Sequence, residues 1–222
     1  MARPTYPRAG EPRPAALPPA ERTVGQVVAE SIRFYGEHFK ASLLLGLAPG
    51  LLVIVGTHVS SRALYVLTPT LTGALLSASY LGACVLVLDR RPADRRLVQA
   101  WLVGWLVFVP VPFLVVAFIL PALAWLAAVG LAVPVLVVED LAPREAIARA
   151  WRLARADYVH VLGSLATLAI VVLLTQGMLA FLLRGSGGAA MSTAFFLAAV
   201  VISPLLLIGS ALLYVDQVAR VE

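Results

Sequence analysis

Long apolar blocks alternate with short charged segments along the chain, and this alternation predicts its architecture. A block of about 20 apolar residues crosses the ~30 Å hydrocarbon core of a membrane as a helix. Six such spans are predicted, at about 41–59, 63–88, 98–119, 121–138, 159–183 and 191–215. The chain is therefore predicted to be an all-α, polytopic membrane protein whose transmembrane domain covers residues 22–222.

The third and fourth spans lie in one stretch without charge, from Val98 to Val138. This stretch is too long for a single span of about 20 residues. Prolines at positions 110, 112 and 121 offer places to turn, and the turn is predicted near Leu120 and Pro121. A re-entrant hairpin, which enters and leaves the membrane on the same side, is the alternative.

An amphipathic segment precedes the first span and another precedes the fifth. In the first, Thr23 and Gln26 fit a capping box, and apolar residues follow at helical spacing. In the second, Pro143 suits the first helical position, and Glu145 is placed to pair with Arg149 one turn later. Both segments are predicted to be interfacial amphipathic helices along the headgroups of the cytoplasmic face. For the first, a helix packed on cytoplasmic loops is the alternative.

The two amphipathic segments indicate an internal repeat with an offset of 119 residues. The offset pairs Val28 with Ile147, Ile32 with Trp151, Arg33 with Arg152 and Phe39 with Tyr158. Each segment is followed by one span out and one span back. We therefore expect two parallel units that flank the third and fourth spans, an arrangement found in transporters and also produced by simple duplication.

Composition and charge agree with a membrane protein and predict its orientation. The chain is 61% hydrophobic and 13% charged, whereas soluble domains are about 45–50% apolar and about 25% charged. Its net charge of +5 lies on segments between apolar blocks, so binding of nucleic acid is not expected. With both termini cytoplasmic, only Arg62 and Arg184 of the 17 basic residues fall outside. The positive-inside rule therefore predicts six spans with the N and C termini in the cytoplasm.

The first 21 residues differ in composition from the rest of the chain. They contain six prolines among scattered arginine, alanine and glutamate. Proline at this density blocks helix formation and favours extended, solvated chain. Residues 1–21 are therefore predicted to be a disordered, Pro-rich cytoplasmic tail rather than a signal peptide, which needs an apolar core.

The sequence offers no set of residues for catalysis, for a cofactor or for a metal ion. The single cysteine, Cys84, excludes a disulfide within the chain. His38 and His160 are predicted on the cytoplasmic side and His58 on the other, so the three cannot share one metal. The cytoplasmic acids are expected to pair with arginine rather than to bind a metal. No ionisable residue is predicted near the middle of a span, which argues against a proton relay.

Basic residues gather on two predicted cytoplasmic segments, the loop after the second span and the second amphipathic helix. The candidate contacts to lipid headgroups are Arg90, Arg91, Arg95, Arg96, Arg149, Arg152, Arg155 and Trp151. An arginine near an anionic membrane surface contributes about 1 kcal/mol, and tryptophan suits the headgroup zone. The expected partners are the lipid bilayer and its anionic phospholipid headgroups, with a membrane-protein partner as a further hypothesis.

Three loose motifs occur in a characteristic order. The first is Arg-Thr-Val-Gly-Gln-Val-Val at residues 22–28, followed by Arg33, Phe34, Tyr35 and Phe39. The second is Pro134 with a Val-x-Glu step ending at Glu139, followed by an Ala-rich arginine helix that contains Trp151. The third is the ending with Tyr214, Asp216, Arg220 and Glu222. Together they resemble the membrane domain attached to glycerophosphoryl diester phosphodiesterases.

The resemblance covers about residues 23–222. The phosphodiesterase barrel of that family, with its catalytic His, Glu and metal-binding acids, has no counterpart here, so the resemblance implies no enzymatic activity. Ala150 stands where the family has serine before the tryptophan. We expect a non-enzymatic scaffold or auxiliary protein of a bacterial plasma membrane that contacts anionic lipid. The alternative is a transporter of a lipid or small apolar solute. An intramembrane enzyme is a third hypothesis, which lacks a paired set of catalytic residues.

Overall fold

The computed structural model describes the backbone of residues 18–58, 61–185 and 187–222, and the side chains of these residues except 57–67. Most of the predicted tail, and the side chains of His58 and Arg62, lie outside the described residues. The last three residues of that tail, Pro19–Glu21, form a short 3-10 helix, η1, where disorder is predicted.

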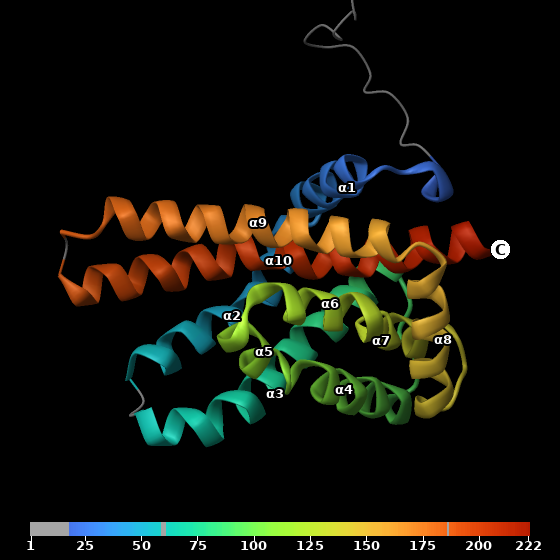
Figure 1. Ribbon diagram of the computed structural model, residues 1–222, viewed down its shortest axis with the longest axis horizontal. Helices are drawn as coiled ribbons and strands as arrows, with labels where there is room; N and C mark the ends of the chain where they lie inside the picture. The colour runs from blue at the N-terminus through green and yellow to red at the C-terminus, as the bar shows by residue number, and fades with distance from the viewer. Residues whose placement is uncertain (1–17, 59–60, 186) are drawn as a thin grey trace, which may run out of the picture.

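Every regular element in the described part of the chain is helical, as predicted (Figure 1). After η1 follow α1 (Val24–Glu37), α2 (Phe39–His58), α3 (Ser61–Leu88), α4 (Asp94–Phe108), α5 (Val111–Ala117), α6 (Ile119–Val129), α7 (Ala132–Val138), α8 (Pro143–Ala156), α9 (Tyr158–Leu182) and α10 (Gly188–Val221).

Six helical stretches among the described residues are long and apolar enough to cross a membrane, which agrees with the predicted number. They are Phe39–Gly56, Thr68–Leu88, Asp94–Ala117, Ile119–Val138, Tyr158–Leu182 and Gly188–Val221. The turn between the third and fourth lies at Phe118, whose backbone is extended at φ −175° and ψ 154°. It therefore comes two residues before the predicted turn, and Pro121 lies in the first turn of α6, where a missing N–H is tolerated.

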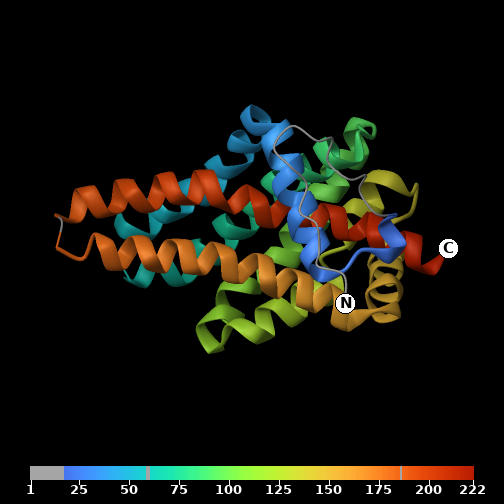
Figure 2. The same cartoon turned by 90° about the horizontal axis from the view of Figure 1, so that it is seen from above.

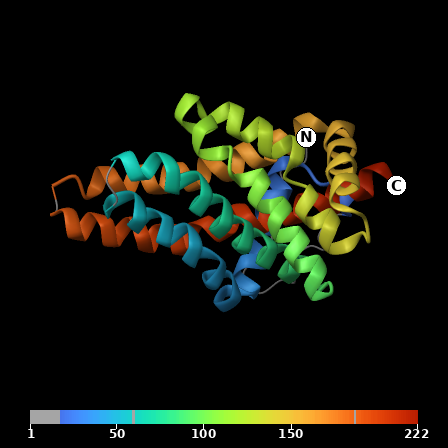
Figure 3. The ribbon, with the colours of Figure 1, turned by 90° about the horizontal axis from the view of Figure 1, so that it is seen from below.

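The third and fourth stretches are each broken near their middle. Pro112 lacks the N–H that would bond to the carbonyl of Phe108, and α4 ends there. Gly130 and Leu131 separate α6 from α7. The turn between α5 and α6 stops short of the ends of the α2–α3 and α9–α10 hairpins (Figures 1 and 3). A re-entrant hairpin requires such a shorter reach. That the third and fourth stretches each cross the membrane, or that they form a re-entrant hairpin, are therefore both still predictions.

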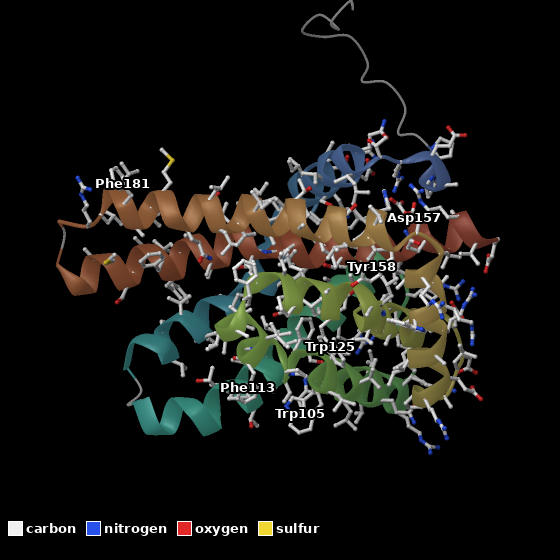
Figure 4. All side chains as sticks on the ribbon, viewed as in Figure 1. Trp105, Phe113, Trp125, Asp157, Tyr158 and Phe181 are labelled. Atoms are coloured by element: carbon white, nitrogen blue, oxygen red, sulfur yellow. The ribbon has the colours of Figure 1, made fainter. Side chains whose placement is uncertain are left out.

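A tryptophan side chain satisfies a backbone carbonyl at the first of these breaks. The indole Nε1 of Trp125, on α6, donates to the carbonyl of Val107 at 2.8 Å (Trp125 is labelled in Figure 4). A carbonyl without a partner is costly in lipid, where no water can replace it. The bond therefore joins α6 to the end of α4.

Replacing Trp125 by phenylalanine is expected to lower the free energy of unfolding by about 1 kcal/mol, because the ring remains and the carbonyl of Val107 loses its donor. Thermal unfolding in detergent measures the change. Trp151→Phe is the control, because the Trp151 side chain is 45% exposed. Equal shifts in the two variants would contradict a structural role for this hydrogen bond.

The α2 helix packs closely against α10 through small residues spaced by four. Ser42, Gly46 and Gly50 lie on one face of α2, and all three are buried. A Cβ built on Gly46 would lie only 1.9 Å from the carbonyl oxygen of Val200 in α10. Pro204 cannot donate to that carbonyl from within α10, since it has no N–H. The glycine therefore lets the two backbones approach, as small residues do between helices in lipid.

The α3 helix lies between α2, α4, α7 and α10, as its small residues predict. Ser77 and Ala83 are fully buried. The hydroxyl of Ser77 donates to the carbonyl of Trp101 in α4 at 2.6 Å. In return, the indoles of Trp101 and Trp105 donate to α3 carbonyls at 3.1 and 3.2 Å. These bonds fix the register between α3 and α4.

The bounds of the helices agree with the predicted repeat. The 119-residue offset carries Val24–Glu37 onto Pro143–Ala156 and the first residue of α2 onto the first residue of α9. A single residue outside both helices, His38 or Asp157, separates each short helix from its long one. The two short helices pack differently, since α1 lies on α9 and α10 (Figure 2), whereas α8 crosses one end of the bundle against α6 and α7 (Figure 1).

The starts of the two short helices are partly as predicted. The backbone N–H of Thr23 donates to Gln26 Oε1 at 2.7 Å, which is one half of a capping box. Pro143 is the first residue of α8. The predicted pair of Glu145 with Arg149 is wrong, because Glu145 accepts a hydrogen bond from the backbone of Ala142 instead. Arg149 is held by other acids, described below.

Candidate functional site at the arginine-rich end

Most of the charged residues lie at one end of the bundle, on the right in Figures 1 and 4. Here the loop between α3 and α4, the helix α8, the start of α1 and the end of α10 come together. We call this region the arginine-rich end. Its arginines are Arg22, Arg90, Arg91, Arg95, Arg96, Arg144, Arg149, Arg152, Arg155 and Arg220.

The last turns of α10 contact α8 and the segment before it. The Tyr214 hydroxyl donates to Glu139 Oε1 at 3.1 Å. Arg149 of α8 pairs with Glu139 at 3.2 Å and with Glu222 at 3.2 Å. One arginine therefore bridges the end of α7 and the end of α10, and this bridge holds α8 across the bundle.

The same turns of α10 also contact the start of α1 and the start of α9. Asp216 is fully buried and pairs with Arg22 at 3.1 Å. Arg220 pairs with Asp157 at 3.0 Å and donates to the backbone carbonyl of Arg22 at 2.6 Å. Asp157 also accepts from the backbone N–H of His160, which caps α9. We call Tyr214, Asp216, Arg220 and Glu222 the C-terminal clasp, because together they connect the end of α10 to four other segments.

A buried polar patch continues from the clasp into the contact between α9 and α10. Asp157 accepts a hydrogen bond from the backbone of His160, and Gln217 lies about one turn of α10 before Arg220. His160 Nε2 and both amide atoms of Gln217 are buried and have no hydrogen-bond partner among the described residues. Buried polar groups are normally satisfied by protein or by ordered water, so this patch is suited to hold water.

The burial of these polar residues differs from the prediction. Asp216 and His160 are predicted at the cytoplasmic surface, whereas they are 0% and 8% exposed. The spacing of Asp157 and His160, three residues apart at the start of a helix, is a capping signal in the sequence. The partner of Asp216 is 194 residues away, and no local pattern indicates it.

The candidate headgroup residues fall into two groups. Arg96 and Arg149 have acidic partners within the protein, since Arg96 pairs with Asp140 at 2.6 Å and also donates to the carbonyl of Leu141. The others are exposed and form no ion pair within the described part of the chain. They are Arg90, Arg91, Arg95, Arg152 and Arg155. The guanidinium group of Arg155 lies 5.9 Å from the centre of the exposed Trp151 ring.

The other residues that could bind a metal ion or react chemically lie apart from one another. Among the described residues, no group of three or more His, Cys, Asp or Glu is placed to hold a metal ion. The ring of His38 stacks on Phe34 with centroids 4.3 Å apart. Cys84 is fully buried beneath Tyr80 in the core. Both residues pack against aromatic side chains.

A partly enclosed cavity of about 50 Å³ lies among buried side chains of the bundle. Its walls come from five of the long helices and are almost entirely apolar, with Tyr80, Phe108, Leu123, Leu165 and Leu207 among them. A space of this size accepts a few water-sized molecules, but not a lipid.

Comparisons of the chain with family models, curated proteins and solved structures gave no match.

Proposed function

We propose that this protein is a non-enzymatic membrane scaffold or auxiliary subunit whose arginine-rich end faces the cytoplasm and binds anionic phospholipid headgroups. The observation that supports this proposal is that the arginines fall into two sets, with and without acidic partners in the described part of the chain. One set stabilises the fold through acids, and a second set projects from α8 and the α3–α4 loop without such partners among the described residues. Exposed arginines beside an exposed tryptophan suit the headgroup zone of an anionic leaflet.

The length of α10 agrees with an arginine-rich end that lies at the headgroups. Its 34 residues span about 51 Å at 1.5 Å per residue, more than the ~30 Å of a hydrocarbon core. The surplus allows the C-terminal clasp to lie at the headgroups or beyond them. The charged face of α8 then lies along the cytoplasmic leaflet, where the positive-inside rule places arginine.

The double variant Arg152→Gln with Arg155→Gln is expected to bind anionic phospholipid about 30-fold more weakly, since each arginine contributes about 1 kcal/mol near an anionic surface. Phosphatidylglycerol titrated into the purified protein in detergent, with bound lipids counted by native mass spectrometry, measures this.

Arg149→Gln is the matched control on the same helix. Because Arg149 is held by Glu139 and Glu222, its loss is expected to lower the Tm and to leave the lipid affinity within about twofold. If the two changes act alike on lipid affinity, or if the double variant binds as the parent does, the proposal is wrong.

The scaffold part of the proposal requires a protein partner. Native mass spectrometry of the protein released directly from its own membrane tests it. A second polypeptide at fixed stoichiometry supports a scaffold or auxiliary role. A monomer or homo-oligomer without a second polypeptide would contradict the scaffold role. If it also carried a retained apolar solute, the result would favour the transporter alternative, although the cavity of about 50 Å³ is too small for a large cargo in this conformation.

The resemblance to the membrane domain of glycerophosphoryl diester phosphodiesterases remains part of the proposal. Two of its three motifs meet in space, because Glu139 of the second contacts Tyr214 of the third. Arg22, which opens the first motif, contacts Asp216 of the third. Residues that define a motif are expected to converge when they hold a common core, and this supports the resemblance.

A further inference from the structure

We infer that an open groove between α2, α3 and α4 binds one anionic phospholipid, with an acyl chain along its apolar lining and the phosphate at Arg91. The inference deepens the proposed function and rests on its claim that this end of the bundle contacts anionic lipid. It assigns one defined lipid position, in addition to the diffuse attraction of the exposed arginines.

The groove is apolar along most of its lining. Its volume is about 670 Å³. Small residues, Ala41 of α2 and Ala78 and Gly82 of α3, line it together with larger side chains such as Leu44 and Leu86. Figure 3 shows α2, α3 and α4 side by side at this face of the bundle. A flexible acyl chain suits such a groove, because association within the bilayer depends on van der Waals packing between apolar surfaces.

Charge at one end of the groove selects the headgroup. Arg91 is the only ionisable residue that lines it, and its side chain is exposed. Asp89, just before it, has a left-handed backbone with φ 47°, which ends α3 and begins the loop. Neither Asp89 nor Asp94 lines the groove, so Arg91 meets the ligand without an acid in between. A guanidinium group binds a phosphate through two parallel hydrogen bonds.

A second groove of similar size provides an internal comparison. It lies between α9 and α10 and has a volume of about 680 Å³. Its lining contains Leu174, Met178 and Ala198 but no charged residue. Lipid chains are expected to cover it without preference for a headgroup. If volume alone decided which lipid is retained, the two grooves would behave alike.

The experiment counts the lipids retained by the full-length protein after reconstitution into equal amounts of phosphatidylglycerol and phosphatidylcholine and gentle extraction. Native mass spectrometry identifies each retained lipid by its mass. The parent protein is expected to keep one phosphatidylglycerol in preference to phosphatidylcholine. Arg91→Gln is expected to lower that preference about fivefold, and Ala78→Leu is expected to lower retention because the larger side chain obstructs the groove.

Ala198→Leu, which places the same larger side chain in the other groove, is the matched control and is expected to retain phosphatidylglycerol as the parent does. Unchanged retention in Ala78→Leu, or equal retention of the two lipids by the parent, overturns the inference.

The Arg152→Gln and Arg155→Gln variant, measured in parallel, separates the two proposals. If only that variant binds less lipid, the groove is not the site and the proposed function stands. If only the groove variants bind less, the general lipid-binding role of α8 fails.

Discussion

Gly46→Leu is expected to lower the free energy of unfolding by about 3 kcal/mol, the upper end of the usual range for overpacking. The added Cβ would lie 1.9 Å from the Val200 carbonyl oxygen and 2.7 Å from Val200 Cα, which are both backbone atoms. No change of rotamer relieves such a contact, so α2 and α10 must move apart. Unfolding of the purified protein in mixed micelles measures the loss.

Gly177→Leu in α9 is the matched control for this prediction. A Cβ at Gly177 meets no described atom within 4 Å, and the position faces outward from a long apolar helix. Leucine is a better helix former than glycine by roughly 0.8–1 kcal/mol, so this variant is expected to be as stable as the parent or more stable. A similar loss in both variants would show that the substitution itself, and not the α2–α10 contact, is responsible.

Asp216→Asn is expected to lower the free energy of unfolding by about 3 kcal/mol, because removing one partner of a buried ion pair leaves the other charge poorly compensated. The Asp216 side chain is fully buried and that of Arg22 is only 12% exposed. The pair joins the start of α1 to the last turns of α10, so its loss should also loosen α1. Hydrogen exchange of the α1 amides would detect this local opening before global unfolding.

The exposed ion pair between Arg33 and Glu37 in α1 gives the comparison for Asp216. Its side chains are 41% and 57% exposed, and their charged atoms lie 3.6 Å apart. Glu37→Gln is therefore expected to change stability by less than about 0.5 kcal/mol. A double-mutant cycle of Arg22→Gln with Asp216→Asn then isolates the coupling within the buried pair. A coupling near zero would mean that Asp216 acts through other contacts.

The C-terminal clasp connects these effects to the proposed role. Its four residues are within nine positions of one another at the end of α10, yet they reach Glu139, Arg22, Asp157 and Arg149 on four other segments. A scaffold needs a rigid surface to present its free arginines, and the clasp fixes α8 relative to the bundle. Weakening the clasp, for example by Arg149→Gln, is therefore expected to lower the Tm while the exposed arginines keep most of their affinity for lipid.

Local sequence patterns predicted what depends on local physics. Apolar length determines which segments can form membrane-spanning helices, and the six stretches follow the predicted spans closely. Capping chemistry placed the starts of α1 and α8 at Val24 and Pro143. The helix bounds also agree with the offset of 119 residues. One residue separates each short helix from the long helix that follows it.

The tertiary structure determined which polar residues form ion pairs, which small residues lie at helix contacts, and which residues are their partners. Arg149 and Arg152 look alike in the sequence, yet only Arg149 meets Glu139 and Glu222, because α8 turns that face toward α10. Gly46 and Gly177 are both glycines in apolar helices, and only Gly46 touches another backbone. Hydropathy determined that helices form and how long they are. Contacts between segments as distant as Arg22 and Asp216 depend on how those helices pack, and periodicity along one helix carries no information about its neighbour.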